Sequence, residues 1–92
     1  MLRRWNEVDI FKLGDKILAL LEFVIGNKLR ELREAKKVTQ LQEVEALDVS
    51  YTHYAKIEEG MRGMSLQMLF KLMTYFETDA NTILGIAVKE AA

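Results

Sequence analysis

Residues 39–60, TQLQEVEALDVSYTHYAKIEEG, decide the fold of this chain. The first nine of them predict a short helix whose apolar side chains recur at helical spacing, at Leu41, Val44 and Leu47. A break of two residues follows, and Ser50 then begins a second short helix that ends within residues 58–60. Two short helices joined by so few residues must cross steeply, which is the geometry of a helix-turn-helix.

The second helix, residues 50–58, carries polar side chains on its outer faces. Its core-facing positions are Tyr54 and Ile57, and the faces that they leave free carry Tyr51, Thr52, His53 and Lys56. Hydrogen-bonding side chains on a protruding helix suit the base edges of a DNA major groove. The pattern therefore indicates double-stranded DNA as the partner.

The composition is that of one soluble globular domain. The chain has 92 residues, of which 50% are apolar and 29% charged, and it contains no proline. With no cysteine and a single histidine, disulfides and thiolate zinc sites are excluded, and neither a metal nor a cofactor is expected. Because no catalytic constellation and no glycine-rich phosphate loop is recognisable, an enzyme is not expected either.

The net charge of −1 is the main compositional argument against DNA binding. Through residue 40 the chain has nine Lys or Arg and six acidic residues, whereas the remainder has four and eight. DNA-binding domains usually carry a basic patch. The charge therefore lowers the expected nonspecific affinity without excluding a specific site.

The most apolar stretch, residues 17–25 with the sequence ILALLEFVI, is too short to cross a membrane. A spanning helix needs about 20 apolar residues, and Glu22 interrupts this run. Acidic residues between Arg4 and the run, and the absence of a small-residue cleavage site after it, argue against a signal peptide. We expect a cytoplasmic protein without membrane contact.

The flanking segments predict further helices. Residues 16–37 are rich in helix formers, with Asp15 as a suitable N-cap and a core-facing stripe at Ile25, Leu29 and Leu32. Gly26 leaves open whether this is one helix or two. A loop at residues 61–64, a helix from Ser65 to about residue 76 and a last helix over residues 78–84 complete an all-α fold of five or six short helices.

Three segments together resemble the XRE-type (lambdoid phage repressor or Cro-like) helix-turn-helix domain. They are IGNKLRELREAKKVTQ, LDVSYTHYAKIEEG and MSLQMLFKLMTYFETDANTILGI. The resemblance covers residues 25–86, about two-thirds of the chain. It implies a repressor-like bundle with a central helix-turn-helix, preceded by an N-terminal arm and apolar helix in residues 1–24 and followed by a tail in residues 87–92.

The resemblance also implies roles for particular residues. Gln40 matches a phosphate-binding position, Ser50 caps the recognition helix, and Arg62 lies in a loop that approaches the DNA backbone. Arg33 and Glu58 match a partly buried ion pair. The full set of expected DNA contacts is Thr39, Gln40, Ser50, Tyr51, Thr52, Lys56 and Arg62.

Some positions depart from the family pattern. Val44 stands where the family has a small Ala, Asp48 where it has a turn Gly, and Met61 where Lys is common. Glu43 occupies the position of a buried Leu. Either Glu43 is buried at an energetic cost, or the helix is rotated so that Leu41 faces inward.

The apolar run of residues 17–25 is not explained by the family domain, and two interpretations remain open. Residues 1–14, with Trp5 and Phe11, fold back over it as a lid, or the run forms a homodimer interface. Helix-turn-helix proteins commonly dimerise to read two half-sites about 34 Å apart. The interface candidates are Ile17, Leu18, Leu20, Leu21 and Val24.

These observations predict a sequence-specific DNA-binding transcriptional regulator, a dimeric repressor that reads a short palindromic operator through helix 50–58. Phage, mobile-element, restriction-control and antitoxin contexts remain open. The alternative is a protein-interaction module of the same fold, antitoxin-like or partner-binding, with weak or no DNA binding.

Overall fold

The computed structural model describes residues 7–85, and every regular element in this range is an α-helix. The five helices are α1 (Glu7–Lys36), α2 (Gln40–Leu47), α3 (Tyr51–Glu58), α4 (Leu66–Tyr75) and α5 (Ala80–Leu84). The expected all-α fold is confirmed, but α1 is not short, because it has 30 residues.

Helix α1 is one continuous element that runs through both Gly14 and Gly26. It begins at Glu7, so the prediction of an N-cap at Asp15 was wrong. A glycine inside a helix costs only about 1 kcal/mol relative to alanine, too little to break a segment otherwise composed of helix formers. The domain boundary expected between residues 24 and 25 therefore lies inside a helix.

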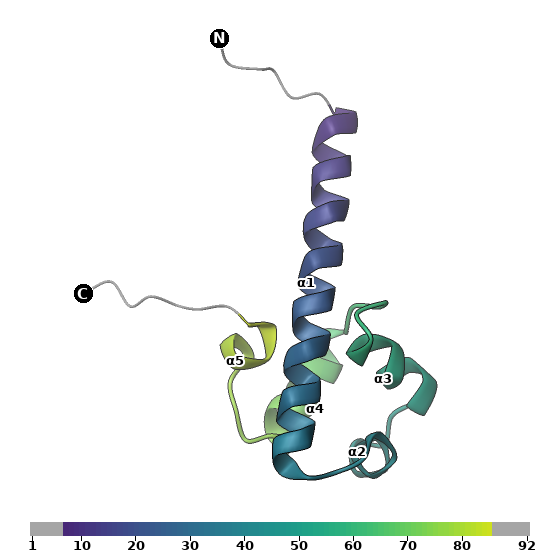
Figure 1. Ribbon diagram of the computed structural model, residues 1–92, viewed down its shortest axis with the longest axis vertical. Helices are drawn as coiled ribbons and strands as arrows, with labels where there is room; N and C mark the ends of the chain where they lie inside the picture. Colours follow the sequence, from purple (N-terminus) through teal and green to yellow (C-terminus); the bar gives the residue numbers. More distant parts are fainter. Residues whose placement is uncertain (1–6, 86–92) are drawn as a thin grey trace, which may run out of the picture.

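The other four helices gather around the C-terminal half of α1, and its N-terminal half projects from them (Figure 1). We call residues 10–24 of this projecting half the stalk. Residues 7–14 continue the helix instead of folding back, which contradicts the lid interpretation for them. Trp5, the other residue of that interpretation, and the tail in residues 87–92 lie outside the described residues.

Gly26 is the point of closest approach between α1 and α3. A Cβ atom at this position would lie 2.5 Å from the carbonyl oxygen of Glu58 and 2.7 Å from that of Ile57. The end of α3 therefore rests directly on the backbone of α1, a contact that any larger residue would push apart. The close approach of the two helices therefore requires glycine at position 26.

One core joins all five helices. Its buried side chains come from each element in turn: Leu29, Val44, Leu47, Tyr54, Ile57, Met68, Leu72 and Ile83. Ile25 and Leu32 pack against them, as the predicted stripe of α1 requires. Met68 and Met73 are core or core-packed residues, in keeping with the interpretation of these methionines as filler.

The helix starts are set by local caps. Thr39, Ser50, Ser65 and Asp79 each accept a hydrogen bond from the backbone N–H three residues on. Asp48 ends α2 in the left-handed conformation, with φ of 55°.

In the described range, no helix is both long and apolar enough for a membrane span.

Candidate nucleic-acid interface

Helices α2 and α3 form the predicted helix-turn-helix, with a turn made by Asp48 and Val49. Beyond the left-handed Asp48, the backbone N–H of Val49 donates to the carbonyl of Val44 at 3.1 Å and closes the end of α2. Ser50 then caps α3. This short connection holds the two helices in the fixed relation that the motif requires.

Helix α3 is divided into a buried side and an exposed side. It buries Tyr54, Ile57 and Glu58. Tyr51, Thr52 and Lys56 are exposed, and His53 is partly buried. The side chains of α3 that the sequence predicted to contact DNA are thus exposed to solvent.

Two neighbouring segments contact this exposed side of α3. The Tyr51 hydroxyl donates to Oε1 of Gln40 at 3.2 Å, which links the first residues of α3 and α2. Nη1 of Arg62, in the loop after α3, lies 2.9 Å from Nδ1 of His53. Because a guanidinium can only donate, Nδ1 accepts and His53 carries its proton on Nε2. Gln40 and Arg62 therefore both lie beside the exposed side of α3.

The remaining two candidates are held by their capping bonds. Thr39 Oγ1 accepts from the Gln42 N–H at 3.1 Å, and the Thr39 N–H donates to the Gln42 side chain at 2.8 Å, which completes a capping box. Ser50 Oγ accepts from the His53 N–H at 3.3 Å. Both hydroxyls stand at helix N-termini, where the partial positive charge favours phosphate.

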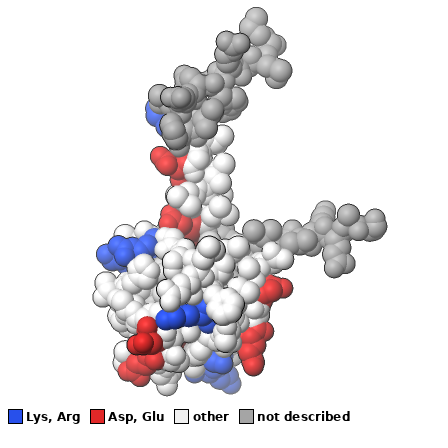
Figure 2. Space-filling view, turned by 180° about the vertical axis from the view of Figure 1, so that it is seen from behind, with Lys and Arg blue, Asp and Glu red and all other residues white. Residues whose placement is uncertain are grey.

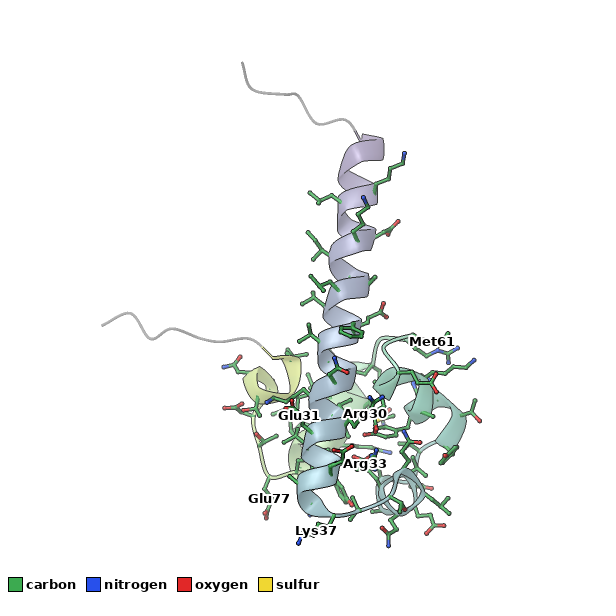
Figure 3. All side chains as sticks on the ribbon, viewed as in Figure 1. Arg30, Glu31, Arg33, Lys37, Met61 and Glu77 are labelled. Atoms are coloured by element: carbon green, nitrogen blue, oxygen red, sulfur yellow. The ribbon has the colours of Figure 1, made fainter. Side chains whose placement is uncertain are left out.

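Arg33 of α1 holds the inner side of α3 through Glu58. Its Nη2 donates to Oε1 of Glu58 at 2.8 Å and its Nε to both carboxylate oxygens at 3.1 Å. Burial acts to raise the pKa of Glu58, but the Arg33 hydrogen bonds and charge, together with the nearby Tyr54 hydroxyl and Gln40 side chain, outweigh it, and the pKa lies below its ordinary value. Arg30 approaches the same carboxylate at 3.6 Å, and Figure 3 shows both arginines on the side of α1 that faces α3.

Glu43 is buried and Leu41 is exposed, which decides between the two alternatives that the sequence left open. Glu43 has no exposed surface, whereas Leu41 is 56% exposed, so Glu43 takes the buried position and the helix is not rotated to turn Leu41 inward. Val44 and Leu47 are buried together with Glu43. Among the described residues, neither carboxylate oxygen of Glu43 has a hydrogen-bond partner.

The surroundings of Glu43 favour its protonated form. Burial raises the pKa of this carboxyl from 4.5 to about 7, and the charge of Glu58 adds to the shift. The hydroxyl of Tyr54 lies nearby and opposes the shift in part, without meeting hydrogen-bond geometry to the carboxyl. Tyr54 is itself fully buried, and burial raises its pKa far above the ordinary range.

One supporting contact had no signal in the sequence. Nζ of Lys71 in α4 donates to the carbonyl of Leu47 at 3.1 Å, which satisfies a free carbonyl at the C-terminus of α2. The residues are 24 positions apart, so no local pattern could have paired them.

The surface charge is mixed. On the face shown in Figure 2, basic and acidic side chains lie in several small groups among uncharged surface, and this face has no broad basic patch. No group of three or more metal-ligating side chains is assembled among residues 7–85. Helix α3 and its neighbours offer hydrogen-bonding side chains for recognition.

The five apolar interface candidates lie on the stalk and its junction with the domain. Ile17, Leu18, Leu20, Leu21 and Val24 are between 36% and 62% exposed. Leu18 and Leu21 also line a shallow apolar groove of about 280 Å³ against Leu66 and Leu69 of α4. None of the five contributes to the exposed side of α3.

Comparison with known proteins gives two matches. A helix-turn-helix family model matches residues 29–83. The crystal structure of the restriction-modification controller protein C.AhdI from Aeromonas hydrophila is 27% identical, with a TM-score of 0.63, over 67% of this chain and 94% of the controller. A search of curated proteins found no match.

Proposed function

The chain belongs to the XRE-type helix-turn-helix family, and on that premise we propose that it is a dimeric repressor that reads a short palindromic DNA site through α3. Membership of this family makes it a DNA-binding transcriptional regulator and not an enzyme. The repressor role, the dimer and the palindrome are the proposed part.

The exposed polar side of α3 carries the proposal. Tyr51, Thr52 and Lys56 are placed to meet base edges in a major groove, while the core-facing side of the helix is held by Arg33. Lysine binds guanine or phosphate, and the tyrosine and threonine hydroxyls donate or accept. These three residues are the proposed specificity determinants.

The proposed phosphate contacts surround this helix. Thr39 and Gln40 stand at the N-terminus of α2, Ser50 at that of α3, and Arg62 beside His53. Backbone N–H groups at helix N-termini attract phosphate, and Arg62 adds a positive charge in the loop that follows α3. Such contacts orient the helix in the groove and carry no sequence information of their own.

Dimerisation would give the short recognition helix its specificity. One α3 of eight residues reads few base pairs, whereas two related by a two-fold axis read two half-sites about 34 Å apart. The similarity to a restriction-modification controller favours a restriction-control context among the alternatives considered.

Selection of bound fragments from random double-stranded DNA at 100 mM salt tests the proposal. We expect wild type to enrich a palindromic motif, and Lys56→Ala to weaken or relax it by roughly 10- to 100-fold at the contacted position. Lys12→Ala removes the same charge from the stalk and should leave the motif unchanged. If wild type enriches nothing, the sequence-specific role is wrong.

A protein-interaction module of the same fold is the second candidate. It is favoured by the net charge of −1 and by two large apolar side chains of α4, Leu66 and Phe70, which are 84% and 69% exposed. Salt dependence separates the two roles. A dimer that neutralises 6–10 phosphates should lose about 10³- to 10⁵-fold in affinity between 50 and 200 mM salt, and a protein contact much less.

A further inference from the structure

The stalk carries an apolar stripe that repeats in steps of three and four residues. Counting along α1, the stripe takes Leu13, Ile17, Leu20 and Val24. Spacings of 4, 3 and 4 match the a and d positions of a heptad repeat, so the four residues share one side of the helix. We call this stripe the seam.

The seam is unpaired within the described part of the chain. Leu13, Ile17, Leu20 and Val24 are 45%, 50%, 62% and 36% exposed, although they are large and apolar. Lys12, Asp15, Lys16 and Glu22 all lie off the seam. In Figure 3 the side chains on one side of the projecting helix are apolar, while the charged ones project from the other.

The seam ends at Val24, the residue that the end of α5 contacts. Gly85, the C-cap of α5, lies so close to Val24 that a Cβ atom there would be 2.8 Å from Cγ1. The next two positions in the repeat are polar, Asn27 and Glu31, and both lie beside Gly85. The apolar part of the repeat thus ends at the residue that Gly85 contacts.

We propose that the seam pairs in parallel and in register with the seam of a second copy of this chain. The inference rests on the proposed dimer and specifies its contact. Both a positions are β-branched (Ile17, Val24) and both d positions are Leu (Leu13, Leu20), the distribution that favours parallel two-stranded pairing. No charge lies at a or d to oppose self-association.

Two features compensate for the shortness of the seam, which spans less than two heptads. The helix is already nucleated by the packed half of α1, so association does not have to form the first helical turn. Leu21 and Phe23 flank the seam at the e and g positions and widen its apolar surface. A parallel pair also places both domains, and both α3 helices, at the same end of the stalk.

Single cysteines test the contact, because the natural chain has none. We expect Leu13→Cys and Leu20→Cys each to form a disulfide-linked dimer with itself under mild oxidation. Asp15→Cys, on the opposite side of the stalk, should not. An antiparallel pair would instead place a positions opposite d positions, so that Ile17→Cys would link to Leu13→Cys or Leu20→Cys in a mixture, and that result would overturn the parallel arrangement.

A charge in the seam tests its contribution to association. Ile17→Asp should weaken dimerisation by roughly a hundredfold or more in sedimentation equilibrium, because one isoleucine is lost from each chain. Asp15→Lys, off the seam, should not weaken it. Since Ile17 projects from the domain, circular dichroism should report an intact fold.

The remaining outcomes separate this inference from the proposed function. A wild-type chain that stays at 10.6 kDa overturns both the seam and the dimer. A dimer that survives Ile17→Asp and gives no self-link overturns the seam alone, because its contact then lies elsewhere. DNA binding by the same samples is measured separately, so the seam can be disproved while the proposed DNA-binding role still holds.

Discussion

Helices α2 and α3 each bury one glutamate, and the two carboxylates have opposite surroundings. Both helices have eight residues, and Glu43 and Glu58 have 0% and 1% exposed surface. Glu58 accepts three hydrogen bonds from Arg33, whereas neither oxygen of Glu43 has a partner among the described residues. The same residue at the same burial is compensated in one helix and uncompensated in the other.

The contrast shows that burial by itself does not determine the contribution of a charged group to stability. A buried charge without a partner is expensive, while a paired one depends on the geometry of its hydrogen bonds. The pKa of Glu58 accordingly lies below its ordinary value, and that of Glu43 is raised to about 7. The recognition helix carries the compensated carboxylate.

The largest expected effect is the loss of the compensated charge. Glu58→Gln leaves the Arg33 guanidinium without its counter-charge, and we expect the free energy of unfolding to fall by about 3 kcal/mol. This is the lower end of the range for buried pairs, because the Arg33 side chain keeps 16% exposure. Urea unfolding measures it, with Glu59→Gln at the exposed neighbouring residue as the control. An unchanged melting temperature would contradict the role of the pair.

Removing the uncompensated charge should have the opposite sign. Glu43→Leu replaces a buried, unpartnered carboxyl by an apolar side chain, and we expect it to stabilise the protein by roughly 3 kcal/mol at pH 8. Glu45→Leu changes an exposed glutamate of the same helix and should have little effect. If Glu43→Leu destabilises the protein at pH 8, the carboxyl has a partner that the structure lacks.

The pH dependence of that difference follows from the raised pKa. In the folded protein the Glu43 carboxyl keeps its proton up to about pH 7, whereas an ordinary glutamate, as in the unfolded chain, loses its proton near pH 4.5. The free-energy cost of burying the ionised Glu43 carboxylate is therefore absent below pH 4.5, grows as the pH rises, and reaches its full value above pH 7. The stability difference between Glu43→Leu and wild type should shrink by roughly 3 kcal/mol from pH 8 to pH 4.

Replacing the N-cap residues of α2 and α3 should change the free energy of unfolding by similar amounts, unlike replacing the two buried glutamates. Thr39→Ala and Ser50→Ala each remove one bond from a backbone N–H, of 3.1 and 3.3 Å. We expect each to lower stability by about 1 kcal/mol in thermal unfolding, with Ser65→Ala as a third, comparable case. A loss of several kcal/mol at either position would mean that the hydroxyl does more than cap its helix.

The smallest effect is expected where the two helices touch at the surface. Tyr51→Phe removes the exposed hydrogen bond to Gln40 and should change the free energy of unfolding by about 0.5 kcal/mol or less. DNA affinity is the more sensitive measurement, because the same hydroxyl faces the proposed groove. Unchanged affinity would remove Tyr51 from the proposed contacts.

The local features of the motif were predictable from the sequence. Ser50 and Asp79 act on backbone groups three residues away, and Asp48 tolerates a left-handed turn, so a short window contains all the information. The helix-turn-helix, the cap at Ser50 and the family followed from such windows. The outward face of α3 followed as well, because Tyr54 and Ile57 mark its inner side.

Features that depend on distant segments were not predictable. The continuity of α1 through Gly14 and its start at Glu7 were missed, because a glycine lowers helix propensity equally whether or not the helix continues. Gly26 was interpreted only as a potential break, since its contact with the end of α3 joins residues more than 30 positions apart. The burial of Glu43 in place of Leu41 depends on how the whole helix rests on the core.

By itself the sequence determined the helix-turn-helix, the cap at Ser50 and the family, because these depend on side chains within one or two helical turns. The tertiary structure decided which carboxylate receives Arg33 and where α1 emerges from the domain. It also decided that the heptad seam remains uncovered. Those outcomes depend on packing between segments far apart in the chain, where a rotation of one helix changes every partner at once.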